Sequence, residues 1–97
     1  MADRPRLVDG IQVHRMEDGF VILSEAQDRV HYLNATATLV MMLCDGVNTP
    51  DDIAGLLQHE FGLDAPPVRD VAGLLVQLRD EGLLAHQAEL VTNPVPA

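Results

Sequence analysis

The sequence predicts one α+β domain in which a three-stranded antiparallel sheet is followed by a three-helix bundle. Three observations support this fold class. Residues 11–33 consist of short apolar segments separated by turn residues, which is typical of strands. From residue 35 onward, apolar residues recur at steps of three and four, which is typical of amphipathic helices. The chain has 97 residues, a length that suits a single small domain.

Three strands are predicted at residues 11–16, 20–23 and 29–33. Between the first two lies Asp18-Gly19, a dipeptide favoured in two-residue hairpin turns. The third segment, RVHYL, mixes β-branched, aromatic and polar side chains, as a half-buried strand does. In an antiparallel meander the third strand keeps a free edge, and its unpaired N–H and C=O groups are able to pair with another chain.

Three helices are predicted after the strands, each with a start and a stop signal. Asn34 suits the N-cap of the first helix, over about residues 35–45, because its side chain accepts hydrogen bonds from unpartnered N–H groups. Thr49-Pro50 suits the start of the second helix. The glycines expected to end the three helices are Gly46, Gly62 and Gly82. The residues predicted to be buried are Leu39, Val40, Met42 and Leu43 in the first helix, Ile53, Leu56, Leu57 and Phe61 in the second, and Val68, Val71, Leu74, Leu75 and Leu78 in the third.

Glycine also occurs inside two of the predicted helices, where each costs about 1 kcal/mol relative to alanine. We expect Gly55 to allow close packing of helices. For Gly73 two explanations are open, close packing or room for another backbone, because it shares one flank of its helix with Asp70 and Gln77.

The folded domain is predicted to span residues 8–87. Residues 1–7 are mostly polar and are expected to be flexible. Residues 88–97 carry two prolines without periodicity, so a flexible tail is expected there. Leu83 and Leu84 are expected to fold back under the helices. Because the chain ends soon after the predicted domain, we expect a stand-alone protein.

The composition argues against several classes of function. Fifteen acidic and six basic side chains give a formal net charge of −9 (6 minus 15), which repels phosphate backbones, so no nucleic-acid partner is expected. No segment approaches the roughly 18 to 20 apolar residues of a membrane span, and the start lacks the apolar run of a secretory signal. A soluble, cytoplasmic protein without a membrane partner is therefore expected. The single Cys44 excludes an internal disulfide and fits a reduced compartment.

No catalytic or metal-binding pattern is found in the sequence. The four histidines, at positions 14, 31, 59 and 86, fall on separate predicted elements without the spacing of metal ligands. Cys44 is predicted to be buried, and Ser24 lacks the glycine-flanked turn of a nucleophile. The glycines form no phosphate-binding loop. We therefore expect no enzymatic activity, no metal and no cofactor.

Several short motifs, in their order and spacing, resemble the PqqD-like family. They are Leu33-Asn34-Ala35-Thr36-Ala37, Asp45-Gly46, Thr49 with Ile53 and Leu57, Asp70-Val71, and Gly82-Leu83-Leu84. The resemblance covers about residues 8–85. The chain departs from the family pattern where Met41 or Met42 replaces a frequent aromatic residue and where Phe61 replaces a tyrosine. These are exchanges between apolar residues, which affect packing more than the proposed site.

The resemblance implies a winged-helix-like domain that recognises the leader segment of ribosomally made, post-translationally modified peptides. In this family the leader adds as a strand to the free edge of the third strand and rests against the third helix. The domain then presents the leader to a modifying enzyme, such as a radical SAM maturase, a cyclase or a leader peptidase. The peptide-binding residues that the resemblance implies here are Arg29, Val30, His31, Tyr32 and Leu33 of the strand, and Arg69, Asp70, Gly73, Leu74 and Gln77 of the helix.

The roles of individual side chains stay open at this stage. Val30 and Tyr32 share one strand face and are assigned to the core in preference to peptide contact, whereas Arg29 and His31 point the opposite way. Main-chain pairing does not depend on that choice. Asp70 is either a first-turn residue favoured by the helix dipole or a leader contact.

Two other functions are compatible with the predicted elements. One is a winged-helix DNA-binding regulator, although the third helix carries acidic residues beside Arg69 and Arg79 instead of a basic surface. The other is a structural adaptor that dimerises through its edge strand. Salt-sensitive DNA binding would support the first, and a concentration-dependent mass would support the second.

Overall fold

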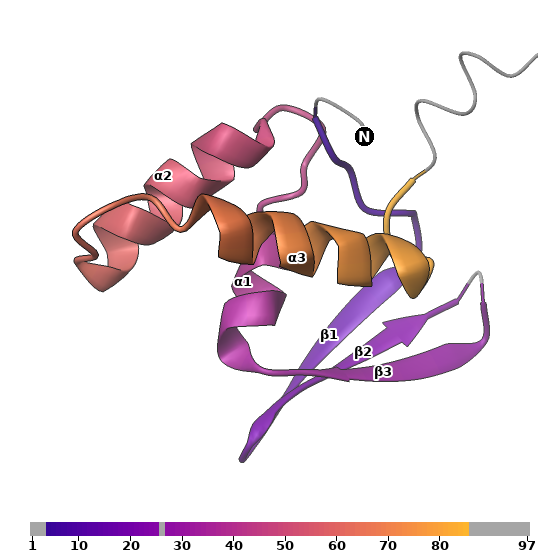
Figure 1. The fold of residues 1–97 in the computed structure, drawn as a ribbon. Helices are drawn as coiled ribbons and strands as arrows, with labels where there is room; N and C mark the ends of the chain where they lie inside the picture. Colours follow the sequence, from indigo (N-terminus) through magenta and orange to yellow (C-terminus); the bar gives the residue numbers. More distant parts are fainter. Residues whose placement is uncertain (1–3, 26, 86–97) are drawn as a thin grey trace, which may run out of the picture.

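An antiparallel sheet lies against three helices in this computed structural model, which describes residues 4–25 and 27–85 (Figure 1). The elements are β1 (Ile11–Met16), β2 (Gly19–Ser24), β3 (Arg29–Leu33), α1 (Ala35–Met42), α2 (Pro50–Phe61) and α3 (Val68–Asp80). The α+β class and the predicted order of three strands and three helices are confirmed.

The sheet has the strand order β1-β2-β3, so β1 and β3 form its two edges. Met16 pairs with Gly19, which makes Glu17 and Asp18 the turn residues instead of the predicted Asp18-Gly19. Gly19 therefore begins β2, with a φ of 156°. A Cβ atom at this position would lie 2.8 Å from the carbonyl oxygen of Leu33, so the close approach to the neighbouring strand requires glycine.

Helix α1 is central, because it contacts β2 and β3 on one side and α3 on the other (Figure 1). The N-cap prediction is confirmed, since Asn34 Oδ1 accepts from the Ala37 N–H at 2.8 Å. The predicted burial is partly wrong: Met41 is fully buried and Met42 is 58% exposed, whereas Val40 is buried as predicted. The sequence ATATLVMM contains no charged residue, so its pattern does not mark which side of the helix faces water.

Helix α1 also ends earlier than predicted, at Met42 instead of near Asp45. Asp45 forms an isolated antiparallel bridge with Arg6. Its carboxylate accepts from the N–H groups of Val47 and Asn48 at 2.8 and 2.9 Å. These bonds lower the pKa of the Asp45 carboxyl, and the bond from the Asn48 N–H has the largest effect. Local side-chain bonding of this kind competes with helix continuation, which explains the early stop.

The start and end signals of α2 are confirmed. Thr49 Oγ1 accepts from the Asp52 N–H at 3.1 Å, and the Asp52 carboxylate accepts from the Thr49 N–H at 2.9 Å, which completes a capping box. The bond from the Thr49 N–H also lowers the pKa of Asp52. Gly62 adopts the left-handed conformation at the C-cap. Three apolar residues of α2 and α3 that were predicted to be buried are exposed, namely Leu56, Phe61 and Val68. A fourth, Leu74, is half-buried.

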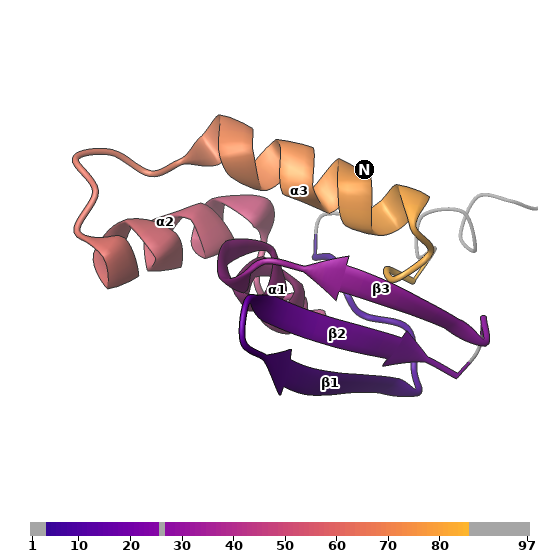
Figure 2. The ribbon, with the colours of Figure 1, turned by 90° about the horizontal axis from the view of Figure 1, so that it is seen from below.

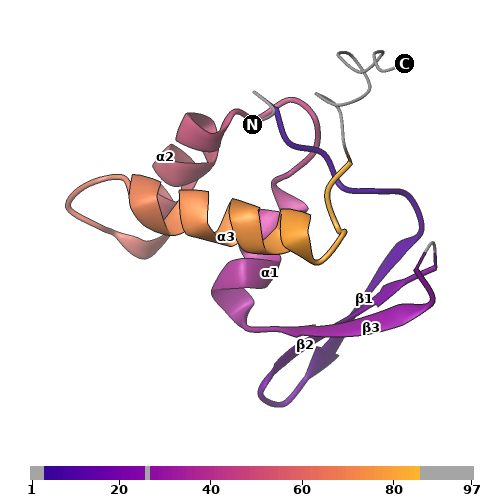
Figure 3. The ribbon, with the colours of Figure 1, turned by 45° about the vertical axis from the view of Figure 1, so that its right-hand side comes forward.

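The segment from Pro5 to Val8 is fixed by hydrogen bonds, although residues up to Leu7 were expected to be flexible. The Leu7 N–H donates to the Cys44 carbonyl at 3.1 Å, and the Val8 N–H donates to the Leu83 carbonyl at 3.0 Å. Leu7 also bridges Leu84 in antiparallel fashion. As Figure 3 shows, this segment lies between the α1–α2 connection and the C-terminal end of the described chain. The predicted tail, residues 88–97, lies outside the described residues.

The core joins one face of the sheet to all three helices. Its fully or nearly fully buried apolar residues are Ile22, Leu33, Ala37, Val40, Met41, Cys44, Ile53, Ala54, Leu57, Val71, Leu75, Leu78, Leu83 and Leu84. Leu83 and Leu84 thus fold back under the helices, as predicted. The expectation of close packing at Gly55 is wrong, because a Cβ atom there would meet nothing within 4 Å. The same open space surrounds Gly73.

Burial makes Cys44 a sensitive probe of the fold. It is 2% exposed, and burial, followed by the charge of Asp45, raises the pKa of its thiol to about 12. We expect the native protein at about pH 8 to react with a disulfide reagent at least ~100-fold more slowly than the unfolded chain, because the thiolate is the reactive form. Equal rates in folded and urea-unfolded protein would contradict this prediction.

The same thiol predicts how stability depends on alkaline pH. The unfolded thiol loses its proton near its ordinary pKa of 9.0, whereas burial in the folded protein raises this pKa to about 12. The contribution is therefore complete below about pH 9 and is lost as the pH rises through 12. Urea unfolding at several pH values should show this loss in the native chain but not in a Cys44→Ala variant.

Candidate peptide-binding surface

Strand β3 forms the edge of the sheet that lies beside α3. Figure 2 shows α3 running along this edge, whereas the other edge, β1, lies farther from the helix. An edge strand carries main-chain N–H and C=O groups that its one neighbouring strand leaves unpaired. The free edge predicted from the sequence is confirmed, and in the described part of the chain α3 lies beside the β3 edge.

The side chains of β3 alternate between buried and exposed positions, but not as predicted. Val30 and Tyr32 are 49% and 77% exposed, whereas His31 and Leu33 are 4% and 5% exposed. The assignment of Val30 and Tyr32 to the core is therefore wrong. The register explains the reversal, because His31 lies opposite the buried Ile22 and therefore faces the helices.

His31 is accommodated in the interior by two hydrogen-bonding partners. Its Nδ1 lies 2.8 Å from Glu81 Oε1, and its Nε2 lies 3.1 Å from Gln27 Oε1. Gln27 Nε2 in turn donates to the Glu81 main-chain carbonyl at 3.0 Å. Gln77 Nε2 donates to the other carboxylate oxygen of Glu81 at 3.1 Å. These bonds join β3 and the preceding loop to the end of α3.

The predicted α3 residues lie mainly on its solvent-facing side. Arg69, Asp70, Gly73 and Gln77 are exposed, and Leu74 is half-buried against the core. Asp70 is the acidic residue in the first turn of a helix whose N-cap, Pro67, makes no side-chain cap. Asp70 thus lies at the positive end of the helix dipole and also on the exposed side of α3. We use the name β3–α3 surface for residues 29–33 together with Arg69, Asp70, Gly73, Leu74 and Gln77.

A small apolar hollow of about 140 Å³ lies between the start of α1, the end of α2 and α3. Its lining residues are Thr36, Leu57, Phe61, Leu63, Pro67, Asp70 and Leu74. Two of them, Asp70 and Leu74, belong to the β3–α3 surface, so the hollow borders that surface. Phe61 explains why the sequence alone missed it: its helical spacing predicted burial in the core, but the ring is 51% exposed.

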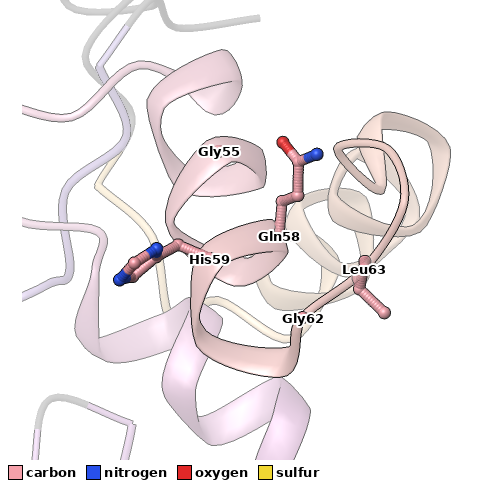
Figure 4. Close-up of a pocket in the computed structure, with 5 residues that line it drawn as sticks. All are labelled: Gly55, Gln58, His59, Gly62 and Leu63. Carbon is pink, nitrogen blue, oxygen red and sulfur yellow. The ribbon is translucent and has the colours of Figure 1, made fainter.

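A second hollow, on α2, offers no comparable site. Its lining residues are Gly55, Gln58, His59, Gly62 and Leu63. Figure 4 shows that the side chains of Gln58 and His59 point in different directions and do not converge on a common point. This arrangement does not position two polar groups on one ligand.

Within residues 4–25 and 27–85, no group of three or more histidine, cysteine or acidic side chains is placed to hold a metal ion. None of the helices in this part of the chain is long and apolar enough to cross a membrane.

Comparisons with known proteins agree with the fold described above. A family model described as coenzyme PQQ synthesis protein D (PqqD) matches residues 19–84. A solved structure of lasso peptide synthetase B1 complexed with the leader peptide is similar at a TM-score of 0.64 and 26% identity, covering 84% of this chain and 98% of that chain. TbiB1 in complex with the TbiA(beta) leader peptide is similar at a TM-score of 0.67 and 23% identity, covering 84% and 95%. No curated protein matches the chain in sequence.

Proposed function

Because this chain belongs to the PqqD family, we propose that it is a non-catalytic module that binds the leader segment of a ribosomally made precursor peptide. The leader adds to β3 as a fourth strand of the sheet. The observation that carries this proposal is the free edge of β3 beside α3. The similar lasso peptide synthetase B1, whose structure was solved in complex with the leader peptide, supports the choice of ligand.

Strand addition divides recognition between main chain and side chains. Main-chain hydrogen bonds to β3 supply affinity that depends little on sequence, and flanking side chains select the peptide. Val30 and Tyr32 are exposed and lie on the face of the sheet opposite the helices. They contact alternate leader residues on that face. Leu74 and the adjoining hollow accept an apolar leader side chain on the helix face.

The bound leader is presented to a second protein that modifies or cleaves the precursor in the cytoplasm. A radical SAM maturase, a cyclase and a leader peptidase are the candidates for this partner. The module supplies binding and leaves the chemistry to that enzyme. The net charge of −9 favours a partner with a basic contact surface.

An amide-resolved NMR titration tests this function. The ligand is the leader segment of a short precursor peptide encoded beside the gene. Saturable shifts are expected at residues 29–33 and 69–77, and the opposite edge, Ile11–Met16, serves as the internal control. Shifts on β1 alone, or none with the protein folded at high peptide concentration, would reject leader binding at β3. A mass that doubles with protein concentration would indicate instead that the edge pairs two copies of the chain.

The two helical glycines provide a matched pair of variants. Both Gly55→Ala and Gly73→Ala should stabilise the protein by about 0.5–1 kcal/mol, because alanine favours helix and neither Cβ meets an atom within 4 Å. Only Gly73 lies on the β3–α3 surface. We therefore expect Gly73→Ala to weaken leader binding several-fold and Gly55→Ala to leave it unchanged, as measured by urea unfolding and calorimetry. Equal leader affinity in the two variants would remove Gly73 from the binding surface.

A further inference from the structure

The hydrogen bonds around His31 specify its protonation state. Gln27 contacts the Glu81 main-chain carbonyl, which only accepts hydrogen bonds, so the amide NH₂ of Gln27 must face that carbonyl. Its oxygen, Oε1, then faces His31 Nε2 at 3.1 Å, and this ring nitrogen must donate. The orientation of the Gln27 amide is thus fixed independently of the histidine.

The other ring nitrogen also faces an acceptor. His31 Nδ1 lies 2.8 Å from Glu81 Oε1, and the second oxygen of the same carboxylate accepts from Gln77. A neutral imidazole has one donor and one acceptor nitrogen, whereas the imidazolium has two donors. With Glu81 ionised, both bonds of His31 are therefore made at once only when the ring is protonated.

Few other charges face this buried ring. Glu81, after the end of α3, is the charged partner, and its side chain is 30% exposed. The residues of β2 nearest in register, Ile22 and its neighbour on the same face, Ser24, are uncharged. Helix α1 contains no ionisable side chain. At the end of α3, Arg79 and Asp80 are exposed and pair with each other at 3.6 Å.

We infer that protonated His31 is a positioning residue for the β3–α3 surface. Its two bonds, with Gln27 and Glu81, form what we call the His31 clamp, which ties the strand that receives the leader to the helix against which the leader rests. Loss of the ring proton breaks one bond of the clamp and loosens the strand from the helix. The consequence of this inference rests on the proposed function. Leader affinity falls as the pH rises across the range in which histidines change charge.

The clamp is tested first in the free protein, without any leader. ¹⁵N spectra of the histidine rings, with His31 assigned by loss of its signal in His31→Gln, should show two protonated ring nitrogens at about pH 5.5. On raising the pH, amides of β3 and of Gly73 to Gln77 should shift with the same midpoint as the ring. Glu81→Gln should reduce these coupled shifts at least twofold. The control Glu60→Gln, which removes an exposed charge on α2, should leave them unchanged. A neutral ring at about pH 5.5, or a ring that titrates without moving the α3 amides, overturns the clamp.

Leader affinity is then measured with the same leader segment as in the titration above. Loss of one charged hydrogen bond predicts binding about tenfold weaker at pH 8.5 than at pH 5.5 in the native chain and in Glu60→Gln. In Glu81→Gln the difference should fall below about twofold. A leader that binds equally at both pH values overturns the clamp and leaves strand addition intact. A leader that binds at neither pH, while the ring and amide shifts remain coupled, rejects the proposed function and supports the clamp.

Discussion

A leader peptide with N-methyl groups at three alternate residues should lose at least ~100-fold in affinity, whereas the same three groups moved by one residue should change it only a few-fold. The reason is the period of two in a strand, in which alternate residues direct their N–H groups toward the neighbouring strand and the others direct them away. Each methyl removes one hydrogen bond worth about 0.5–1.5 kcal/mol and also crowds the partner strand. Three such losses together lower the leader affinity by two or more powers of ten.

This experiment leaves the protein unchanged, so the fold of β3 is not at risk. Titration calorimetry with the unmethylated leader gives the reference affinity, and the two methylated peptides control for each other in composition. Equal losses in the two peptides would show that the leader binds without strand pairing. No loss in either would place recognition in side chains alone.

Replacing Gly82 with alanine should destabilise the protein by about 2–3 kcal/mol. Gly82 has a φ of +79°, which costs an alanine about 1–2 kcal/mol, and the added Cβ would collide with the Gln27 amide. That collision displaces Gln27 from the Glu81 carbonyl and from His31. The free energy of unfolding from urea titration measures the loss.

Gly62→Ala is the matched control for this variant. Gly62 is also left-handed, with a φ of +62°, but a Cβ atom there would meet nothing within 4 Å. It should show the backbone cost alone, so the difference between the two variants reports the contact with Gln27. If both variants lose the same stability, the hydrogen bonds of Gln27 do not require a glycine at position 82. The His31 clamp then tolerates a side chain at that position.

The order of the elements and most helix signals were predictable because they rest on local chemistry. Asn34 and Thr49 cap helices through their own side chains, and Gly62 ends one through its own backbone freedom. Such features depend on residues a few positions apart. The third strand and its free edge followed in the same way, from turn residues on either side of residues 29–33.

Which side of each element faces the core was decided by the tertiary structure. Alternation in β3 defines two faces but does not say which is inside, and apolar Val30 and Tyr32 proved exposed while His31 proved buried. The same holds for α1, whose uncharged sequence gave no sign that Met41 would be buried and Met42 exposed. An apolar side chain is tolerated at the surface, but a polar side chain is buried only where hydrogen-bonding partners are present.

Those partners come from distant parts of the chain. His31 is 50 residues from Glu81, and no sequence spacing links them. By itself, the sequence determined a strand with a free edge, a following helix and the family resemblance that suggested a peptide ligand. The fold alone decided that α3 lies along that edge and that a buried histidine joins the two, because such contacts depend on the path of the chain between them and not on neighbouring residues.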